Sequence, residues 1–298
     1  MRQAARIIPR DEKTRLFSGG CPPVRDDCSL YISKAAPEIF MSPIKEPQFF
    51  ADFLGEHRRI CTWSDYLNCF AGADHEKRIG EASVAYLAAP NSARDIKVFS
   101  PQARIIIMLR NPVDVMNSLY HLRRFSNLED ELSFESALAA DEHGRRSYEL
   151  TYRERVRFAE QTKRFIDTFG RENVHIILFD DFKADTAMVY RDTLKFLDVQ
   201  SDVRTNFPVV NANPRARSQA LWNVVRRPPQ LLRSIIHPLT SQNARKSMGR
   251  LLIRLNVVYE ERPPIAADLM FRLKIEFAPE VEKLGAVIGR DLGAWCQT

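Results

Sequence analysis

The stretch ARIIIMLRNPVDVMNSLY, residues 103–120, decides the fold of this chain. Its residues Ile105–Leu109 form a short run that is apolar on both faces, which predicts a buried parallel strand. Pro112 cannot donate a ladder hydrogen bond and pushes Asn111 out of the helical region, so the strand must end there. From Val113 the apolar residues follow a helical spacing. The stretch therefore predicts a strand, a tight turn and the start of a helix.

Arg110 stands at the carboxyl edge of this predicted strand, where the ligands of open α/β sheets gather. The free N–H groups of a helix N-terminus favour phosphate and sulfate. Ser118 adds a hydroxyl about two turns into the helix. The other interpretation is that Arg110 is a solvated or salt-bridged surface residue and Ser118 an ordinary surface serine. This stretch alone leaves both interpretations open.

Several other segments repeat the alternation of short apolar strands and helices. A second buried-type strand is expected at 174–179, and residues 79–87 predict a short strand that runs into a turn and a helix. Helices are expected at 152–169, with Gly170 as the C-cap, and at 188–197. Such alternation indicates parallel βαβ units and an α/β sheet.

Composition indicates an ordinary globular protein. The 298 residues are 45% hydrophobic and 28% charged, and a chain of this length can bury a sizeable core. No apolar run reaches the roughly 18 residues of a membrane helix, and the N-terminus lacks the apolar region of a signal peptide. The five cysteines contain no C-x-x-C pair, which favours free thiols in a reducing compartment. We therefore expect a cytoplasmic protein without a membrane span, and its oligomeric state stays open.

Positive charge is concentrated in residues 204–259, which hold ten Lys or Arg residues and no Asp or Glu. Such a stretch raises the local concentration of anions. Alternatively, it is a solvated basic face, or it pairs with the acidic region 129–142. Nucleic-acid binding by 204–254 would predict a steep salt dependence, but interleaved aromatic residues are scarce there. We therefore expect no nucleic-acid partner.

Common nucleotide and hydrolase motifs are absent from the sequence. It contains no G-x-x-x-x-G-K-[ST] or G-x-G-x-x-G, which disfavours generic nucleoside triphosphate hydrolysis and dinucleotide redox chemistry, and it contains no G-x-S-x-G or H-E-x-x-H either. Asp180 and Asp181 follow a predicted strand, but paired acids at such a turn are more often caps than Mg²⁺ ligands. We expect no metal.

Two prolines, Pro43 and Pro47, bracket the charged pair Lys45–Glu46 within PEIFMSPIKEPQFF, residues 37–50. Prolines hold the backbone extended and rigid, which suits the presentation of two charged side chains into a cleft.

Several stretches together resemble the sulfotransferase family that uses 3′-phosphoadenosine 5′-phosphosulfate (PAPS), in particular bacterial members related to the glycosaminoglycan sulfotransferases. They run in order from about residue 29 to 295. The stretches are the Lys-Glu segment 37–50, GEASVAYL at 80–87, the R-x-P-x-x-x-x-x-S-x-Y pattern at 110–120, LKFLDV at 194–199, NANPRARS at 211–218 and IGRDLGAW at 288–295.

The resemblance implies a P-loop-NTPase-like α/β fold with three layers, in which helices flank a central parallel sheet. It also implies that Arg110 and Ser118 bind the 3′-phosphate of the donor, and that Ser29 and Arg217 lie in further donor-binding motifs. Residues 29–298 would then form a single sulfotransferase-like domain.

By the same resemblance, Glu46 corresponds to the general base that takes the proton of the acceptor hydroxyl, and Lys45 neutralises charge on the transferring sulfate. A carboxylate enclosed by Phe49 and Phe50 would have a raised pKa. The implied activity is transfer of a sulfuryl group from PAPS to a hydroxyl of a sugar, lipid or small molecule.

The N-terminal segment departs from the family pattern. Where the family has G-A-P-[KR]-x-G-T-T-S-L-Y, residues 21–31 are CPPVRDDCSLY, and Asp26 and Asp27 bring negative charge to the phosphosulfate loop. We expect residues 1–28 to be atypical and poorly ordered, with the first strand and the loop missing. Three explanations are open: a reading-frame or start error, an inactive relative, or an unusual loop in which Arg25 supplies the cation.

A second function is therefore considered beside the enzyme. A homologue without a working loop would act as a binding protein for 3′-phosphoadenosine nucleotides, such as 3′-phosphoadenosine 5′-phosphate (PAP), or for other anionic partners.

Overall fold

The computed structural model of the chain describes residues 15–20, 37–126, 128–142, 150–200, 207, 214–218, 224–225, 247–248, 251–252, 255–259 and 263–297. The strands in these ranges are β1 (Arg15–Gly20), β2 (Ile39–Met41), β3 (Arg78–Ala82), β4 (Arg104–Leu109), β5 (Val174–Leu178), β6 (Pro214–Ala216) and β7 (Val257–Tyr259). The α-helices are α2 (Trp63–Asn68), α3 (Ala85–Ala88), α4 (Ser92–Phe99), α5 (Pro112–Phe125), α6 (Phe134–Glu142), α7 (Tyr152–Arg155), α8 (Phe158–Phe169), α9 (Phe179–Ala184), α10 (Thr186–Leu197) and α14 (Ala267–Ile288). Short 3-10 turns occur at η2 (Asp52–His57), η3 (Arg171–Asn173) and η4 (Gly293–Trp295).

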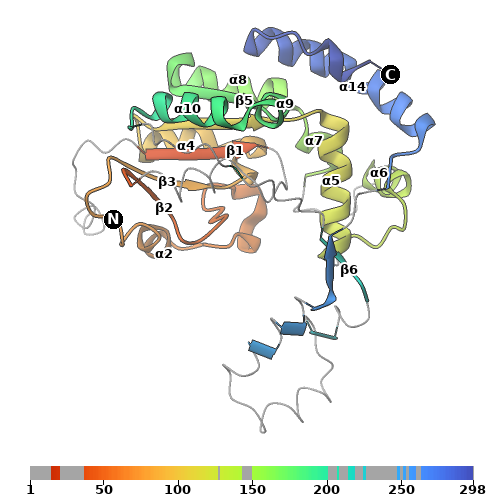
Figure 1. Cartoon of the computed structure of the whole chain (residues 1–298), viewed down its shortest axis with the longest axis horizontal. Helices are drawn as coiled ribbons and strands as arrows, with labels where there is room; N and C mark the ends of the chain where they lie inside the picture. The colour runs from red at the N-terminus through yellow and green to blue at the C-terminus, as the bar shows by residue number, and fades with distance from the viewer. Residues whose placement is uncertain are drawn as a thin grey trace.

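The central sheet has five strands in the order β2-β3-β1-β4-β5, and every pair is parallel. Because the strands are parallel, their carboxyl ends meet at one edge of the sheet, from which α5 runs away in Figure 1. The expected parallel sheet, the strand that ends at Leu109 and the helix that follows it are confirmed.

The expectation that the first strand is missing is wrong. β1 lies in the middle of the sheet, between β3 and β4, and pairs with both. Its sequence RLFSGG holds a serine and two glycines instead of an apolar run, so the local pattern does not reveal a strand. Backbone pairing on both sides makes this segment a strand. Residues 1–14 and 21–36, including the altered loop, lie outside the described residues.

Side chains of β4 alternate between two hydrophobic cores, and this alternation defines the layers. Ile105, Ile107 and Leu109 belong to a core shared with α3, α4, α5, α8 and α14. Ile106 and Met108 face the opposite side and pack with α9 and α10. The sheet therefore lies between two helical layers. In the layer that contains α8, α14 packs on α8 (Figure 1).

The single helix expected over 152–169 is wrong, because the structure divides it into α7 and α8. Thr151 begins α7 with a capping box that pairs it with Glu154. A backbone break follows, and Glu280 from α14 accepts a hydrogen bond from the N–H of Ala159 at 2.8 Å. The carboxylate satisfies an amide that has no partner within the first turn of α8. A residue distant in sequence therefore stabilises the second helix start.

β6 and β7 form a separate antiparallel pair, and β6 packs beside α5 (Figure 1). Most Lys and Arg residues of the basic stretch 204–259 lie outside the described residues. None of the described helices is long and apolar enough to cross a membrane.

Candidate active site

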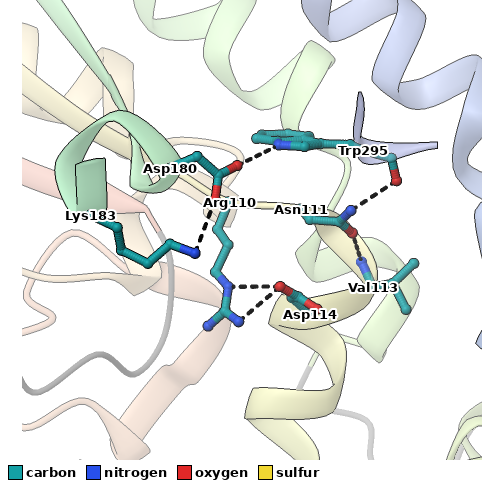
Figure 2. Close-up of polar contacts among 7 residues, drawn as sticks. All are labelled: Arg110, Asn111, Val113, Asp114, Asp180, Lys183 and Trp295. Atoms are coloured by element: carbon teal, nitrogen blue, oxygen red, sulfur yellow. Dashed lines mark hydrogen bonds and ion pairs between the residues drawn. The ribbon is translucent and has the colours of Figure 1, made fainter. Parts of the chain in front are cut away.

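The turn from β4 into α5 is held by the C-terminal segment. Asn111 caps α5, because its Oδ1 accepts a hydrogen bond from the N–H of Val113 at 3.0 Å. Its Nδ2 donates to the carbonyl of Trp295 at 2.9 Å, and the Trp295 Nε1 donates to Asp180 at the start of α9 at 2.7 Å. Figure 2 shows these hydrogen bonds among Asn111, Val113, Asp180 and Trp295. The C-terminal turn thus connects the starts of α5 and α9.

Arg110 lies immediately after β4, and its side chain is positioned by the carboxylate of Asp114 and the ring of Phe179. Its Nε and Nη2 donate to Asp114 Oδ2 at 3.1 and 2.8 Å (Figure 2). The guanidinium carbon lies 5.0 Å from the centroid of the Phe179 ring, and Lys183 Nζ lies 5.3 Å from the same centroid. Two cations therefore gather where β4 and β5 end. Asp114 offsets part of the charge of Arg110 but also orients its planar fork.

Ser118 lies one turn beyond Asp114 on α5. Its side chain is fully buried, and its Oγ has no hydrogen-bond partner among the described residues. Buried hydroxyls are nearly always hydrogen-bonded, so this one calls for a partner that the described residues do not supply. A phosphate oxygen is a suitable acceptor for this hydroxyl.

The Lys-Glu loop, residues 42–48, reaches the same edge of the sheet from β2. The backbone N–H of Glu46 donates to the carbonyl of Ala82, the last residue of β3, at 3.1 Å. The Glu46 Oε2 accepts from the N–H of Val84 at 2.9 Å. Lys45 is exposed. Glu46 and Gln48 have φ values of 54° and 60°, a left-handed conformation that is costly for residues with a side chain.

Glu81, within β3, is a fully buried carboxylate beside this loop. Its Oε1 accepts hydrogen bonds from the hydroxyls of Tyr66 and Tyr86 at 3.2 and 2.5 Å, and its Oε2 accepts one from Ser83 at 2.8 Å. Burial raises the pKa of Glu81 to about 7, although the three hydroxyl hydrogen bonds act to lower it. The sequence predicted no role for this residue. An acid within a buried strand was the available signal.

The two aromatic residues that follow the loop, Phe49 and Phe50, pack around Tyr66. The ring centroid of Phe49 lies 4.5 Å from that of Tyr66, and the centroid of Phe50 lies 5.2 Å from it. The hydroxyl of Tyr66 donates a hydrogen bond to Glu81, so the aromatic group contacts Glu81 through Tyr66. The raised pKa expected for Glu46 stays a prediction.

The structure brings some predicted residues together and leaves others apart. Glu46 lies at the carboxyl end of β3 and Arg110 at that of β4, with β1 between these strands. The chain therefore leaves β1 between the two candidate positions. Ser29 lies outside the described residues. Arg217 is exposed just after β6, and its N–H donates to the carbonyl of Asn256 at 2.7 Å.

Within the described ranges, no group of three or more His, Cys, Asp or Glu side chains is placed to hold a metal ion. The two acids after β5 have other contacts: Asp180 accepts from Trp295, and Asp181 pairs with Arg290 at 3.1 Å.

The family model described as sulfotransferase domain matches residues 29–217, which is more than half of the chain. The chain belongs to the sulfotransferase domain family. The expected P-loop-like α/β fold and the assignment as an enzyme of this family are thereby confirmed.

A solved structure agrees with this membership. The crystal structure of a sulfotransferase from Alicyclobacillus acidocaldarius matches 96% of this chain and 100% of its own, with 29% identity and a TM-score of 0.71. A mouse sulfotransferase complexed with PAP matches 64% of this chain and 61% of its own, with 15% identity and a TM-score of 0.44, too distant to carry an argument here. No curated protein matches the sequence.

Proposed function

We propose that this enzyme transfers a sulfuryl group from PAPS to the hydroxyl of an acceptor that is a sugar, a lipid or a small molecule. The observation that carries the proposal is the fully buried hydroxyl of Ser118, on the helix that begins beside Arg110, which has no hydrogen-bond partner in the described part of the chain. An anion with several acceptor oxygens satisfies both groups, and family membership supports a 3′-phosphate as that anion.

The residues of the site have separate roles in this proposal. Arg110 and the N-terminus of α5 bind the 3′-phosphate through charge-assisted hydrogen bonds, and Ser118 donates its hydroxyl. Glu46 accepts the proton of the acceptor hydroxyl, and Lys45 offsets the negative charge that develops during transfer. Ser29 and Arg217 are kept as proposed donor contacts on the sequence resemblance alone.

Titration calorimetry with PAP tests the binding half of the proposal. We expect Arg110→Ala to weaken PAP binding by roughly tenfold or more, because a hydrogen bond to a charged group contributes about 1.5–3 kcal/mol. Arg94→Ala is the matched control, since Arg94 is an exposed arginine that contacts a neighbouring acid, Asp95, at 2.9 Å. Equal PAP affinity in the wild type and Arg110→Ala would contradict the proposed donor site.

Turnover measurements with PAPS and a panel of hydroxyl acceptors test the catalytic half. We expect Glu46→Gln to lower kcat by about a hundredfold or more while PAP affinity stays unchanged, because the variant keeps the shape of the side chain but cannot take a proton. Near-normal turnover in this variant would rule out the base role. PAP binding by a wild type that turns over no acceptor would favour the alternative, a nucleotide-binding homologue without activity.

A further inference from the structure

The Lys-Glu loop is anchored to a short segment at the end of β3. Glu46 donates its backbone N–H to Ala82, and its side chain accepts from the N–H of Val84. The N–H of Gln48 donates to the hydroxyl oxygen of Ser83 at 3.0 Å. Both ends of the strained Glu46–Gln48 backbone are therefore held by residues 82–84.

Ser83 depends in turn on Glu81. A serine hydroxyl has one proton to donate, and Ser83 gives it to Glu81 Oε2 at 2.8 Å. That donation turns an oxygen lone pair toward the N–H of Gln48. Glu81 is itself fixed by Tyr66 from α2 and Tyr86 from α3. Glu81 and Ser83 are both fully buried, so water does not replace these contacts.

The backbone of the loop requires such support. Residues other than glycine in the left-handed region cost of order 1–3 kcal/mol each and persist only where surrounding contacts determine the conformation. Glu46 and Gln48 are both in this region, at φ 54° and 60°. The hydrogen bonds with residues 82–84 are among the contacts that hold them, beside those that the carbonyls of Pro47 and Gln48 accept from the N–H groups of Ile60 and Ala51.

We propose that Glu81 is a positioning residue for the Lys-Glu loop: through Ser83 it holds Gln48, and so it sets the direction in which Lys45 and Glu46 face the acceptor. The catalytic consequence rests on the proposed function of Glu46. The structural consequence, that the loop is held in one conformation, does not depend on the proposed function of Glu46.

Hydrogen–deuterium exchange tests the structural consequence without an activity assay. In Glu81→Gln an NH₂ group replaces one carboxylate oxygen, and this group donates hydrogen bonds but cannot accept them, so the chain Glu81–Ser83–Gln48 is disturbed. We expect amide exchange in residues 42–50 to accelerate by about tenfold, with residues 104–125 unchanged. Ser83→Ala should reproduce this effect. Glu280→Gln is the control, since Glu280 also accepts from a backbone amide, that of Ala159, but at α8.

Kinetics test the consequence for catalysis. We expect Glu81→Gln to lower kcat by roughly tenfold, with the acceptor KM and the PAP Kd changed less than about twofold. In a Glu46→Gln background the same substitution should add less than about twofold, because both residues act through one carboxylate. Unchanged exchange at 42–50, or effects on kcat that multiply in the double variant, would overturn the proposal. If the wild type turns over no acceptor, the proposed function fails, and the exchange result decides the positioning role alone.

Discussion

Glu81 shows how burial changes the chemistry of a single residue. Its pKa is raised from 4.5 to about 7, with desolvation as the main cause. Between these two pKa values the folded protein keeps a proton that the unfolded chain releases. The contribution of Glu81 to the free energy of unfolding is therefore fully present below pH 4.5 and decreases as the pH rises toward 7.

We predict that Glu81→Gln flattens this pH dependence. Over the window from pH 4.5 to 7, the stability of the wild type should fall relative to that of the variant by roughly 3 kcal/mol, the free energy that corresponds to the pKa shift. Urea unfolding at several pH values measures the difference between the two curves. Parallel curves would show that Glu81 ionises in the folded protein as it does in the unfolded chain.

At the scale of elements, the C-terminal turn η4 positions two helix starts at the candidate donor site. The backbone carbonyl of Trp295 holds Asn111, the cap of α5, and its indole N–H holds Asp180 in the first turn of α9. Arg110 lies immediately before that cap, and Lys183 belongs to α9 (Figure 2). The turn therefore sets where the two cations lie relative to each other.

We predict that Trp295→Phe lowers the free energy of unfolding by about 1 kcal/mol, because it keeps most of the apolar ring but removes the hydrogen bond to Asp180. Denaturant unfolding measures the loss. Trp63→Phe is the control: its indole is more exposed and donates no hydrogen bond within the described residues. Equal losses in both variants would mean that ring size, and not the Asp180 contact, sets the effect.

At the scale of the whole molecule, donor binding should stabilise the entire domain, because the site draws on both helical layers. Arg110 follows a strand that contributes to both cores, and Phe179, on which it lies, belongs to the core under α9 and α10. A ligand that binds only the folded chain adds its binding free energy to that of folding.

We predict that PAP at about a hundred times its Kd raises the Tm by roughly 5 °C, which corresponds to about 2.7 kcal/mol. Differential scanning calorimetry measures the shift. Adenosine 5′-phosphate at the same concentration is the control, because it lacks the 3′-phosphate that Arg110 and Ser118 are proposed to bind. An equal shift with this nucleotide would exclude 3′-phosphate recognition as the source of binding.

The sequence alone predicted the elements whose signals are local. The apolar run Ile105–Leu109, the break at Pro112 and the C-cap at Gly170 each depend on a few neighbouring residues, and the structure has β4, α5 and the end of α8 at these places. The family motifs are also short and can be read directly from the sequence. The resemblance that they carry agrees with the family match over residues 29–217.

Only the tertiary structure decided the features that join distant residues. β1 is a strand because β3 and β4 pair with it, although RLFSGG is not an apolar run. The break between α7 and α8 involves Glu280, more than a hundred residues away in the chain. Burial raises the pKa of Glu81, a carboxyl for which the sequence predicted no role, because packing determines which side chains lose water. Hydrophobic periodicity and turn preferences depend on neighbouring residues in the sequence. Desolvation and strand pairing depend on distant residues that folding brings into contact.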